Sequence, residues 1–344
     1  MVVAPLAAVA VPSFAITAES PMKVVIQIPC RDEAATLSAT IAGLPRTIAG
    51  IDEIAIVVVD DGSFDDTAKI AASLGAHVVS LRAQRGLAVA FMAGIETALA
   101  LGADIVVNTD GDNQYVGEDA AQLARAVMNG DADVAIGARP IAAMPNFSTA
   151  KKLLQRVGSW VVRRLSGVNV ADATSGFRAY SRESALQLSV FSGYTYTLET
   201  IVQSAQRGMR IASIPIRVNA VDRPSRLAKG NAHYIWRAGT ELARMFVVYR
   251  PFRFFILPAI VSTLAGIGLV ARFAWFYVVS SGAGHVQSLV LAAMLLGIGG
   301  ALVVVALIGD LLAINRRMLE EIRLDARRRR FERTRASSTT ARGE

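Results

Sequence analysis

The chain has 344 residues, of which 53% are hydrophobic and 19% charged, with a formal net charge of +8 and a mean hydropathy of +0.42. The length suggests about two domains, and the high apolar content excludes a disordered chain. The single cysteine excludes an intrachain disulfide framework and any multi-cysteine zinc or iron–sulfur site. Three scattered histidines exclude a histidine-clustered metal site. Any metal would therefore be held by oxygen ligands.

Short apolar strands alternate with helical segments between residues 22 and 230. The preceding segment 1–21 is apolar but lacks the basic start of a signal peptide, so we expect a flexible N-terminal extension. The strands are expected at 23–29, 53–61, 77–81, 104–112 and 133–139. The helices are expected at 33–45, 67–75, 86–101 and 118–129. This alternation predicts an α/β domain over 22–230, with a Rossmann-like, mostly parallel sheet covered on both faces.

Two near-continuous apolar stretches follow, at 254–279 and 288–314, and each is long enough to cross a bilayer of about 30 Å. The eight residues between them predict a helical hairpin spanning 254–314. Arginines flank the pair on both outer sides and are absent from the turn, which places both termini and the α/β domain in the cytoplasm. The sequence therefore predicts a multi-pass protein of the cell (inner or plasma) membrane.

The segments on either side of this hairpin differ in character. Residues 231–253 mix aromatic residues with arginines, as does an amphipathic helix lying at the membrane interface. The basic cytoplasmic tail, 315–344, is rich in Arg, Ser and Thr, and we expect it to be disordered. Because this tail holds most of the excess positive charge, the basic composition does not indicate nucleic-acid binding.

Polar side chains follow three of the expected strands. Parallel sheets bind ligands at the carboxyl ends of their strands, so these residues are expected to meet at one edge. They are Arg31 with Glu33, Asp60 with Asp61, and Asp110 with Asp112.

Asp110 and Asp112, two residues apart after a strand, can hold one divalent cation, with Gln114 adding a carbonyl oxygen. All-oxygen ligation with few protein groups suits Mg²⁺ or Mn²⁺ completed by phosphates. The sequence contains no P-loop motif, no dinucleotide-binding glycine pattern after its first strand, and no acid at the twelfth position of an EF-hand loop. Of the site types considered, the sequence therefore supports a nucleotide-diphosphate site organised by a metal.

Six motifs occur in order: IPCRDEAATL, VVVDDGSFDDT, RGLAVAF, NTDGDNQY, IGAR and DATSGFRAY. Together they resemble the family 2 glycosyltransferases of the GT-A fold. The resemblance is greatest to membrane-anchored polyprenyl-phosphate glycosyltransferases, which include dolichyl-phosphate mannose synthase and bacterial prenyl-phosphate glucosyltransferases. It covers residues 22 to about 230, and the two-helix hairpin also recurs in the membrane-anchored branch. It implies a GT-A catalytic domain followed by an interfacial helix and a transmembrane hairpin.

The resemblance implies a role for each matching residue. Donor binding is implied for Pro29, Arg31, Glu33, Asp60, Asp61, Gly86, Asp110 and Gly111. The implied metal ligands are Asp110, Asp112 and Gln114. Acceptor binding is implied for Arg139, Lys151, Gln155, Ser175, Arg223 and Arg226. The implied catalytic residues are Asp112, Arg139, Lys151 and Arg226. Glu199 lies near the site in relatives, with a structural ion pair as its alternative role.

The resemblance implies a metal-dependent hexosyltransferase using Mg²⁺ or Mn²⁺. Its donor is a nucleotide sugar, with a UDP-sugar the commoner choice among bacterial relatives. It transfers the sugar with inversion to an undecaprenyl or decaprenyl phosphate, for cell-envelope glycan assembly. Three alternatives stay open: a lipid hydroxyl acceptor such as diacylglycerol or ceramide, with Glu199 or Asp172 as general base; a processive polysaccharide synthase, which the absence of a QxxRW motif disfavours; and a non-catalytic nucleotide-sugar-binding membrane subunit. A homo-oligomer is compatible with the sequence.

Overall fold

The structure is a computed structural model that describes residues 21–140, 166–190, 196–219, 247–280 and 286–340, with a few isolated residues at 160–164, 240 and 244. Its centre is a seven-stranded sheet in the order β3-β2-β1-β4-β6-β5-β7. The strands are β1 (Lys23–Cys30), β2 (Glu53–Asp60), β3 (His77–Ser80), β4 (Ile105–Asn108), β5 (Val134–Ala138), β6 (Arg178–Ser181) and β7 (Ile211–Pro215). All neighbouring pairs are parallel except those that β6 makes with β4 and β5. The prediction of a mostly parallel sheet is confirmed.

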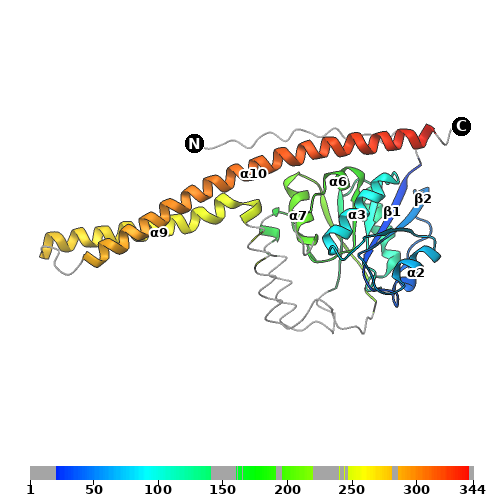
Figure 1. The fold of residues 1–344 in the computed structure, drawn as a ribbon, viewed down its shortest axis with the longest axis horizontal. Coiled ribbons are helices and arrows are strands. Elements are labelled where there is room, and N and C mark those ends of the chain that lie inside the picture. Colours follow the sequence, from blue (N-terminus) through cyan, green and yellow to red (C-terminus); the bar gives the residue numbers. More distant parts are fainter. Residues whose placement is uncertain are drawn as a thin grey trace.

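Helices connect and cover these strands (Figure 1). They are α1 (Leu37–Ala42), α2 (Thr67–Ser73), α3 (Leu87–Ala100), α4 (Ala120–Met128, after a 3₁₀ turn at Gly117–Asp119), α6 (Arg182–Gln187) and α7 (Thr197–Gln206). Up to residue 139 the observed elements match the expected ones in type and order, but α1 is shorter than the expected 33–45 and β4 ends at Asn108 instead of residue 112.

The central strands are apolar throughout because both faces of the sheet are covered. In β1, Val25 belongs to the core cluster beneath α3, whereas Val24 and Ile26 belong to the cluster on the opposite face. All three side chains have no exposed surface. Alternate residues of β1 therefore contribute to the apolar cores on the two faces of the sheet.

Two long apolar helices extend away from this domain, α9 (Pro251–Ser280) and α10 (Val286–Thr340). Figure 1 shows them lying side by side as a hairpin, with α10 continuing past α9 and across the α/β domain. Within the described residues, these two helices are long and apolar enough to cross a membrane. The expected spans 254–279 and 288–314 fall inside them.

The expectation of a disordered C-terminal tail is wrong up to Thr340, since α10 is helical to that residue. Leu324 and Phe331 pack against the core cluster that contains Phe91 of α3, and Phe331 is only 2% exposed. Arginine, leucine and glutamate are good helix formers, which makes the tail compatible with a helix. Leu324, Arg327 and Phe331 recur at helical spacing, so they share the face that contacts the domain.

Candidate active site

The predicted site residues gather where β1, β2 and β4 end. In the register of the sheet, Cys30 pairs with Asp60, and Gln27 pairs with Asn108 of β4. Pro29 is tolerated in β1 because the pairing with β4 has already ended at Gln27. The loops after these three strands therefore leave the same edge of the sheet, as the sequence predicted.

The loops after β1 and β2 are hydrogen-bonded to each other. The backbone N–H of Asp32 donates to Ser63 Oγ at 2.9 Å, and the N–H of Phe64 donates back to Asp32 Oδ1 at 2.8 Å. Glu33 N–H donates to Thr67 Oγ1 at 2.9 Å, and the guanidinium of Arg31 lies 5.8 Å from the centroid of the Phe64 ring. Because these loops hold each other, Arg31 and Glu33 have fixed positions beside the strand ends.

Asp61 is used to anchor a third loop. Its carboxylate accepts hydrogen bonds from the backbone N–H groups of Arg85 at 2.7 Å and Gly86 at 2.9 Å. Gly86 has a φ of 95°, and a side chain on Gly62 would lie 2.9 Å from the backbone of Ala83. Glycine is therefore needed at both positions for the loop that contains Arg85 and Gly86 to pack against Asp61 and Gly62. Asp60 stabilises the loop after β2, since its Oδ1 accepts a hydrogen bond from the backbone N–H of Ser63 at 3.0 Å. The direct contacts of Asp60, Asp61 and Gly86 with a donor stay predictions.

The loop after β4 carries Asp110, Gly111 and Asp112 and is held from both sides. The carbonyl oxygen of Gly111 accepts from the hydroxyls of Thr36 and Thr40 on the α1 side, at 2.9 and 3.1 Å. A Cβ on Gly111 would lie 2.9 Å from the Cβ of Cys30, so only glycine fits against β1. Asp112 Oδ1 accepts from the backbone N–H of Gln114 at 3.1 Å. The acid pair therefore sits on a braced loop.

Asp110 packs tightly against Gly176, where a Cβ would lie 2.8 Å from both carboxylate oxygens. Burial, followed by repulsion from Asp112, raises the pKa of Asp110 to about 7, while Arg139, Tyr115 and Arg178 oppose this rise. A cation between the two carboxylates would relieve that repulsion. Within the described residues, no group of three or more His, Cys, Asp or Glu side chains is arranged so that it could hold a metal ion. The acid pair thus fits a divalent cation whose remaining ligands come from phosphates or water.

Arg139 follows β5 and forms a buried ion pair with Asp172. Its Nε and one terminal nitrogen donate to the two carboxylate oxygens at 2.6 and 3.1 Å, and that terminal nitrogen also donates to Thr174 Oγ1 at 2.8 Å. Burial raises the pKa of Asp172, but the hydrogen bonds and charge of Arg139 outweigh this and hold that pKa below its usual value. Arg139 is therefore a fixed cation near Asp110. The acceptor-binding role of Arg139 stays a prediction.

Polar residues that the sequence analysis did not select tie this edge together. Asn108, at the end of β4, donates from Nδ2 to Gly176 O at 2.7 Å and to the hydroxyl of Tyr196 at 2.8 Å. The fully buried Arg178 donates to the carbonyl oxygens of Ser175 and Thr197, each at 2.8 Å. Asn108 lies in the motif NTDGDNQY and Arg178 in DATSGFRAY, so their place in these motifs is the sequence feature that could have identified them.

Other predicted residues lie in different surroundings. Ser175 is fully buried and its hydroxyl accepts from Phe177 N–H at 3.3 Å, so it supports the turn between Asp172 and β6. Glu199 is on α7, is 6% exposed, and accepts from the hydroxyl of Tyr249 at 3.1 Å. Four predicted acceptor residues lie outside the described part of the chain: Lys151, Gln155, Arg223 and Arg226.

Comparisons with known proteins agree with this geometry. The sequence model described as Glycosyl transferase family 2 matches residues 25–188. An undecaprenyl-phosphate mannosyltransferase of Micrococcus luteus is 32% identical over 206 residues, covering 57% of this chain and 83% of that protein. A dolichyl-phosphate hexose transferase of Haloferax volcanii is 31% identical, covering 54% of this chain and 78% of that protein.

Among solved structures, glucosyl-3-phosphoglycerate synthase of Mycobacterium tuberculosis, in complex with Mn²⁺, UDP and glucosyl-3-phosphoglycerate, superposes with a TM-score of 0.51. The match has 21% sequence identity and covers 64% of this chain and 80% of that one. This likeness establishes the GT-A fold. With its mostly parallel sheet, its braced acid pair and these relatives, the chain belongs to glycosyltransferase family 2.

Proposed function

We propose that this glycosyltransferase moves one sugar from a nucleotide sugar, most simply a UDP-sugar, to a polyprenyl phosphate at the cytoplasmic face of the membrane. One observation carries the proposal: the acid pair Asp110–Asp112 lies close to the fixed cation Arg139. The charges of Asp112 and Arg139 both act on the pKa of Asp110, in opposite directions. The acids suit a metal-bound diphosphate, and the arginine suits a phosphate acceptor. The relatives named for undecaprenyl and dolichyl phosphate support the same assignment.

The donor half of the site rests on Asp110 and Asp112. These carboxylates would hold a Mg²⁺ or Mn²⁺ ion, which would neutralise the negative charge that develops on the departing nucleoside diphosphate. The bracing of this loop by Thr36 and Thr40 keeps the carboxylates in place, so little reorganisation accompanies donor binding. Arg31, Glu33 and the Gly86 loop surround the same edge and would contact the nucleoside.

The acceptor half needs a cation more than a base. A phosphate monoester is already ionised at neutral pH, so its oxygen can attack C1 of the sugar without losing a proton to the enzyme. Arg139 would hold this anion in line against repulsion from the donor diphosphate, and its bidentate pairing with Asp172 fixes the guanidinium for that task. The attack forms the bond from phosphate oxygen to C1 and breaks the bond to the diphosphate. A single displacement inverts the anomeric centre.

The membrane helices support a lipid acceptor. An apolar groove with a volume of about 430 Å³ lies between the start of α9 and α10 and is lined by Phe255, Ile308 and Leu312 among others. Arg316 lies at the same groove. The apolar lining suits a prenyl chain, while the guanidinium of Arg316 is engaged by Glu320.

The contacts of the two candidate bases disfavour a lipid hydroxyl acceptor. Asp172 is engaged by Arg139 and has a pKa below its usual value, which makes it a weak base. Glu199 is buried and accepts a hydrogen bond from Tyr249. The phosphate acceptor, which needs neither, therefore fits better.

The test is an assay of the purified full chain in lipid vesicles with undecaprenyl phosphate, Mn²⁺ or Mg²⁺, and a panel of UDP- and GDP-sugars. We expect glycolipid from at least one donor, and we expect Asp112→Asn to lower turnover at least a hundredfold. Asp131→Asn, an exposed acid in the loop before β5, serves as the matched control and should retain activity. Transfer to diacylglycerol or ceramide in place of undecaprenyl phosphate would overturn the proposal.

A further inference from the structure

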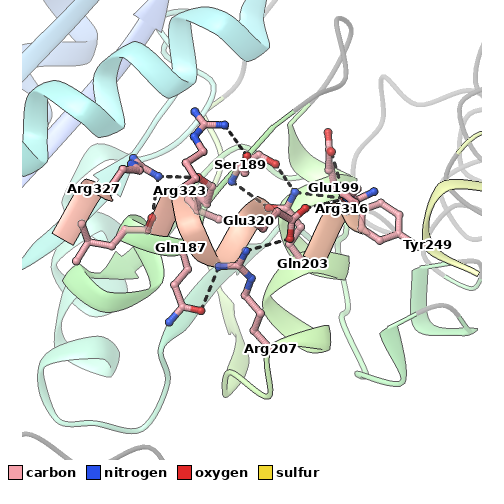
Figure 2. Close-up of polar contacts among 12 residues, drawn as sticks. Gln187, Ser189, Glu199, Gln203, Arg207, Tyr249, Arg316, Glu320, Arg323 and Arg327 are labelled. Atoms are coloured by element: carbon pink, nitrogen blue, oxygen red, sulfur yellow. Dashed lines mark hydrogen bonds and ion pairs between the residues drawn. The ribbon is translucent and has the colours of Figure 1, made fainter. Parts of the chain in front are cut away.

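The C-terminal half of α10 is hydrogen-bonded to the catalytic domain. Arg327, only 7% exposed, donates from one terminal nitrogen to the carbonyl oxygens of Leu186 and Leu188, both at 2.8 Å. One turn earlier, Arg323 donates to Ser189 Oγ at 2.9 Å (Figure 2). The helix that forms one arm of the apolar hairpin is therefore attached to the last turn of α6 and to the residues that follow it.

A second set of contacts joins α10 to α7. The carboxylate of Glu320, 11% exposed, accepts from Arg207 at 3.1 Å and from Nε of Arg316 at 2.8 Å. The guanidinium of Arg316 lies 4.4 Å from the ring centroid of Tyr249, just before α9. The Tyr249 hydroxyl donates to Glu199 Oε1 at 3.1 Å.

These contacts use one face of a single helix. Glu199, Gln203 and Arg207 are spaced four residues apart, and Gln203 Nε2 also donates to the Tyr249 hydroxyl at 3.3 Å. Figure 2 shows these side chains of α7 directed toward Tyr249, Arg316 and Glu320. We call this set the α7–α10 clamp; its members are Glu199, Gln203, Arg207, Tyr249, Arg316 and Glu320.

The N-terminal end of α7 is attached to the reaction edge of the sheet. Tyr196, which precedes α7, receives the hydrogen bond from Asn108 and stacks on Phe91 with ring centroids 3.9 Å apart. A Cβ on Gly176 would lie 2.9 Å from the Tyr196 hydroxyl and 2.8 Å from the Asp110 carboxylate. The same ten-residue helix is thus fixed to the acid-pair edge at its start and to the membrane helices along its face.

We propose that the α7–α10 clamp is a positioning device, which sets the orientation of the catalytic edge relative to the membrane and thereby to the phosphate of a membrane-embedded acceptor. This inference rests on the proposed polyprenyl-phosphate acceptor. When the clamp loosens, the domain spends part of its time in orientations that a lipid phosphate cannot reach. The apparent KM for that acceptor then rises in inverse proportion to the clamped fraction, while the chemistry at the site is unchanged. A soluble acceptor reaches the site in either orientation.

The test compares Glu320→Gln with the matched control Glu321→Gln, which makes the same charge change at the adjacent, exposed position. Each variant is assayed with undecaprenyl phosphate in vesicles and with a water-soluble, short-chain prenyl phosphate. For Glu320→Gln we expect the KM for the vesicle acceptor to rise about three- to tenfold with little change in kcat, and no change with the soluble acceptor. In a second pair, Tyr249→Phe should raise the KM for the vesicle acceptor as Glu320→Gln does, whereas its exposed control Tyr277→Phe should leave that KM unchanged.

Backbone hydrogen exchange provides a readout that is independent of catalysis, and amides of α7 should exchange faster in Glu320→Gln than in Glu321→Gln. Equal losses with both acceptors would mean damage to the site itself and would overturn the inference. So would a Glu320→Gln variant that matches the wild type in KM and in exchange. A wild-type chain that uses neither acceptor would overturn the proposed function, and the inference with it.

Discussion

The buried ion pair between Arg139 and Asp172 should make Asp172→Asn strongly destabilising. Their side chains are 8% and 2% exposed, so the substitution leaves a nearly buried guanidinium without its counter-charge. Removing one partner of such a pair costs about 3–5 kcal/mol. Because asparagine keeps the shape and one acceptor oxygen, we expect a loss near the lower end, about 3 kcal/mol. For a domain of this size that lowers the unfolding temperature by roughly 6–12 °C.

The assay is thermal unfolding of the purified chain as a function of pH. The pKa of Asp172 in the folded chain lies below its usual value, so its stabilisation is present above the unfolded pKa and is lost as pH falls through the folded one. The difference in unfolding temperature between wild type and Asp172→Asn should therefore be largest near pH 7 and should decrease below about pH 4.

The control is Asp133→Asn, whose carboxylate is 31% exposed and pairs with Arg210, itself 61% exposed. An exposed pair contributes at most about 1 kcal/mol, so this variant should unfold within about 4 °C of wild type. The double variant Arg139→Met with Asp172→Asn should recover part of the loss, because no buried charge is then left unpaired. Equal unfolding temperatures for Asp172→Asn and Asp133→Asn would refute the reasoning.

Further predictions concern the donor side and the tail. Gly86→Ala forces an alanine to a φ of 95°, and in steady-state kinetics we expect at least a tenfold rise in KM for the nucleotide sugar. Gly111→Ala pushes a Cβ to 2.9 Å from Cys30 and should weaken Mn²⁺ binding in a calorimetric titration, whereas Gly268→Ala in α9, which meets no atom within 4 Å, should not. Because a cation binds ionised carboxylates and Asp110 has a pKa of about 7, wild-type Mn²⁺ affinity should rise steeply from pH 5.5 through 7 and level off about one pH unit above that pKa. Phe331→Ala should cost about 3 kcal/mol in chemical denaturation, since the ring is 2% exposed; an unchanged midpoint would contradict the docking of α10.

Local patterns made the strands predictable, and with them the edge of the sheet at which the candidate site residues meet. Buried parallel strands such as β1 and β4 must be apolar on both faces, and acids placed directly after them must meet at one edge, so Asp110 and Asp112 stand out in the sequence. The hairpin was equally readable because a bilayer demands long apolar segments.

Contacts between residues far apart in the chain were not predictable in the same way. Asp61 stands out in the sequence as a predicted donor-binding residue, but the sequence does not reveal that its carboxylate also accepts hydrogen bonds from the backbone N–H groups of Arg85 and Gly86, which only the folded loops bring near. Arg327 reads as part of a solvated basic tail, yet it donates to Leu186, more than a hundred positions earlier. In both cases tertiary packing creates contacts that the residue type and its neighbours in the sequence do not reveal.

The most direct test of the central claim is the structure of the product formed from a UDP-sugar with an α-linked hexose and undecaprenyl phosphate in vesicles. Mass spectrometry should show the acceptor increased by one hexose, with UDP released in equal amount, and the NMR coupling at C1 should show a β-linkage to the phosphate. Asp112→Asn should form no such product. An α-linked product, or a hexose attached to a lipid hydroxyl with the phosphate acceptor unused, would contradict single displacement by the phosphate oxygen.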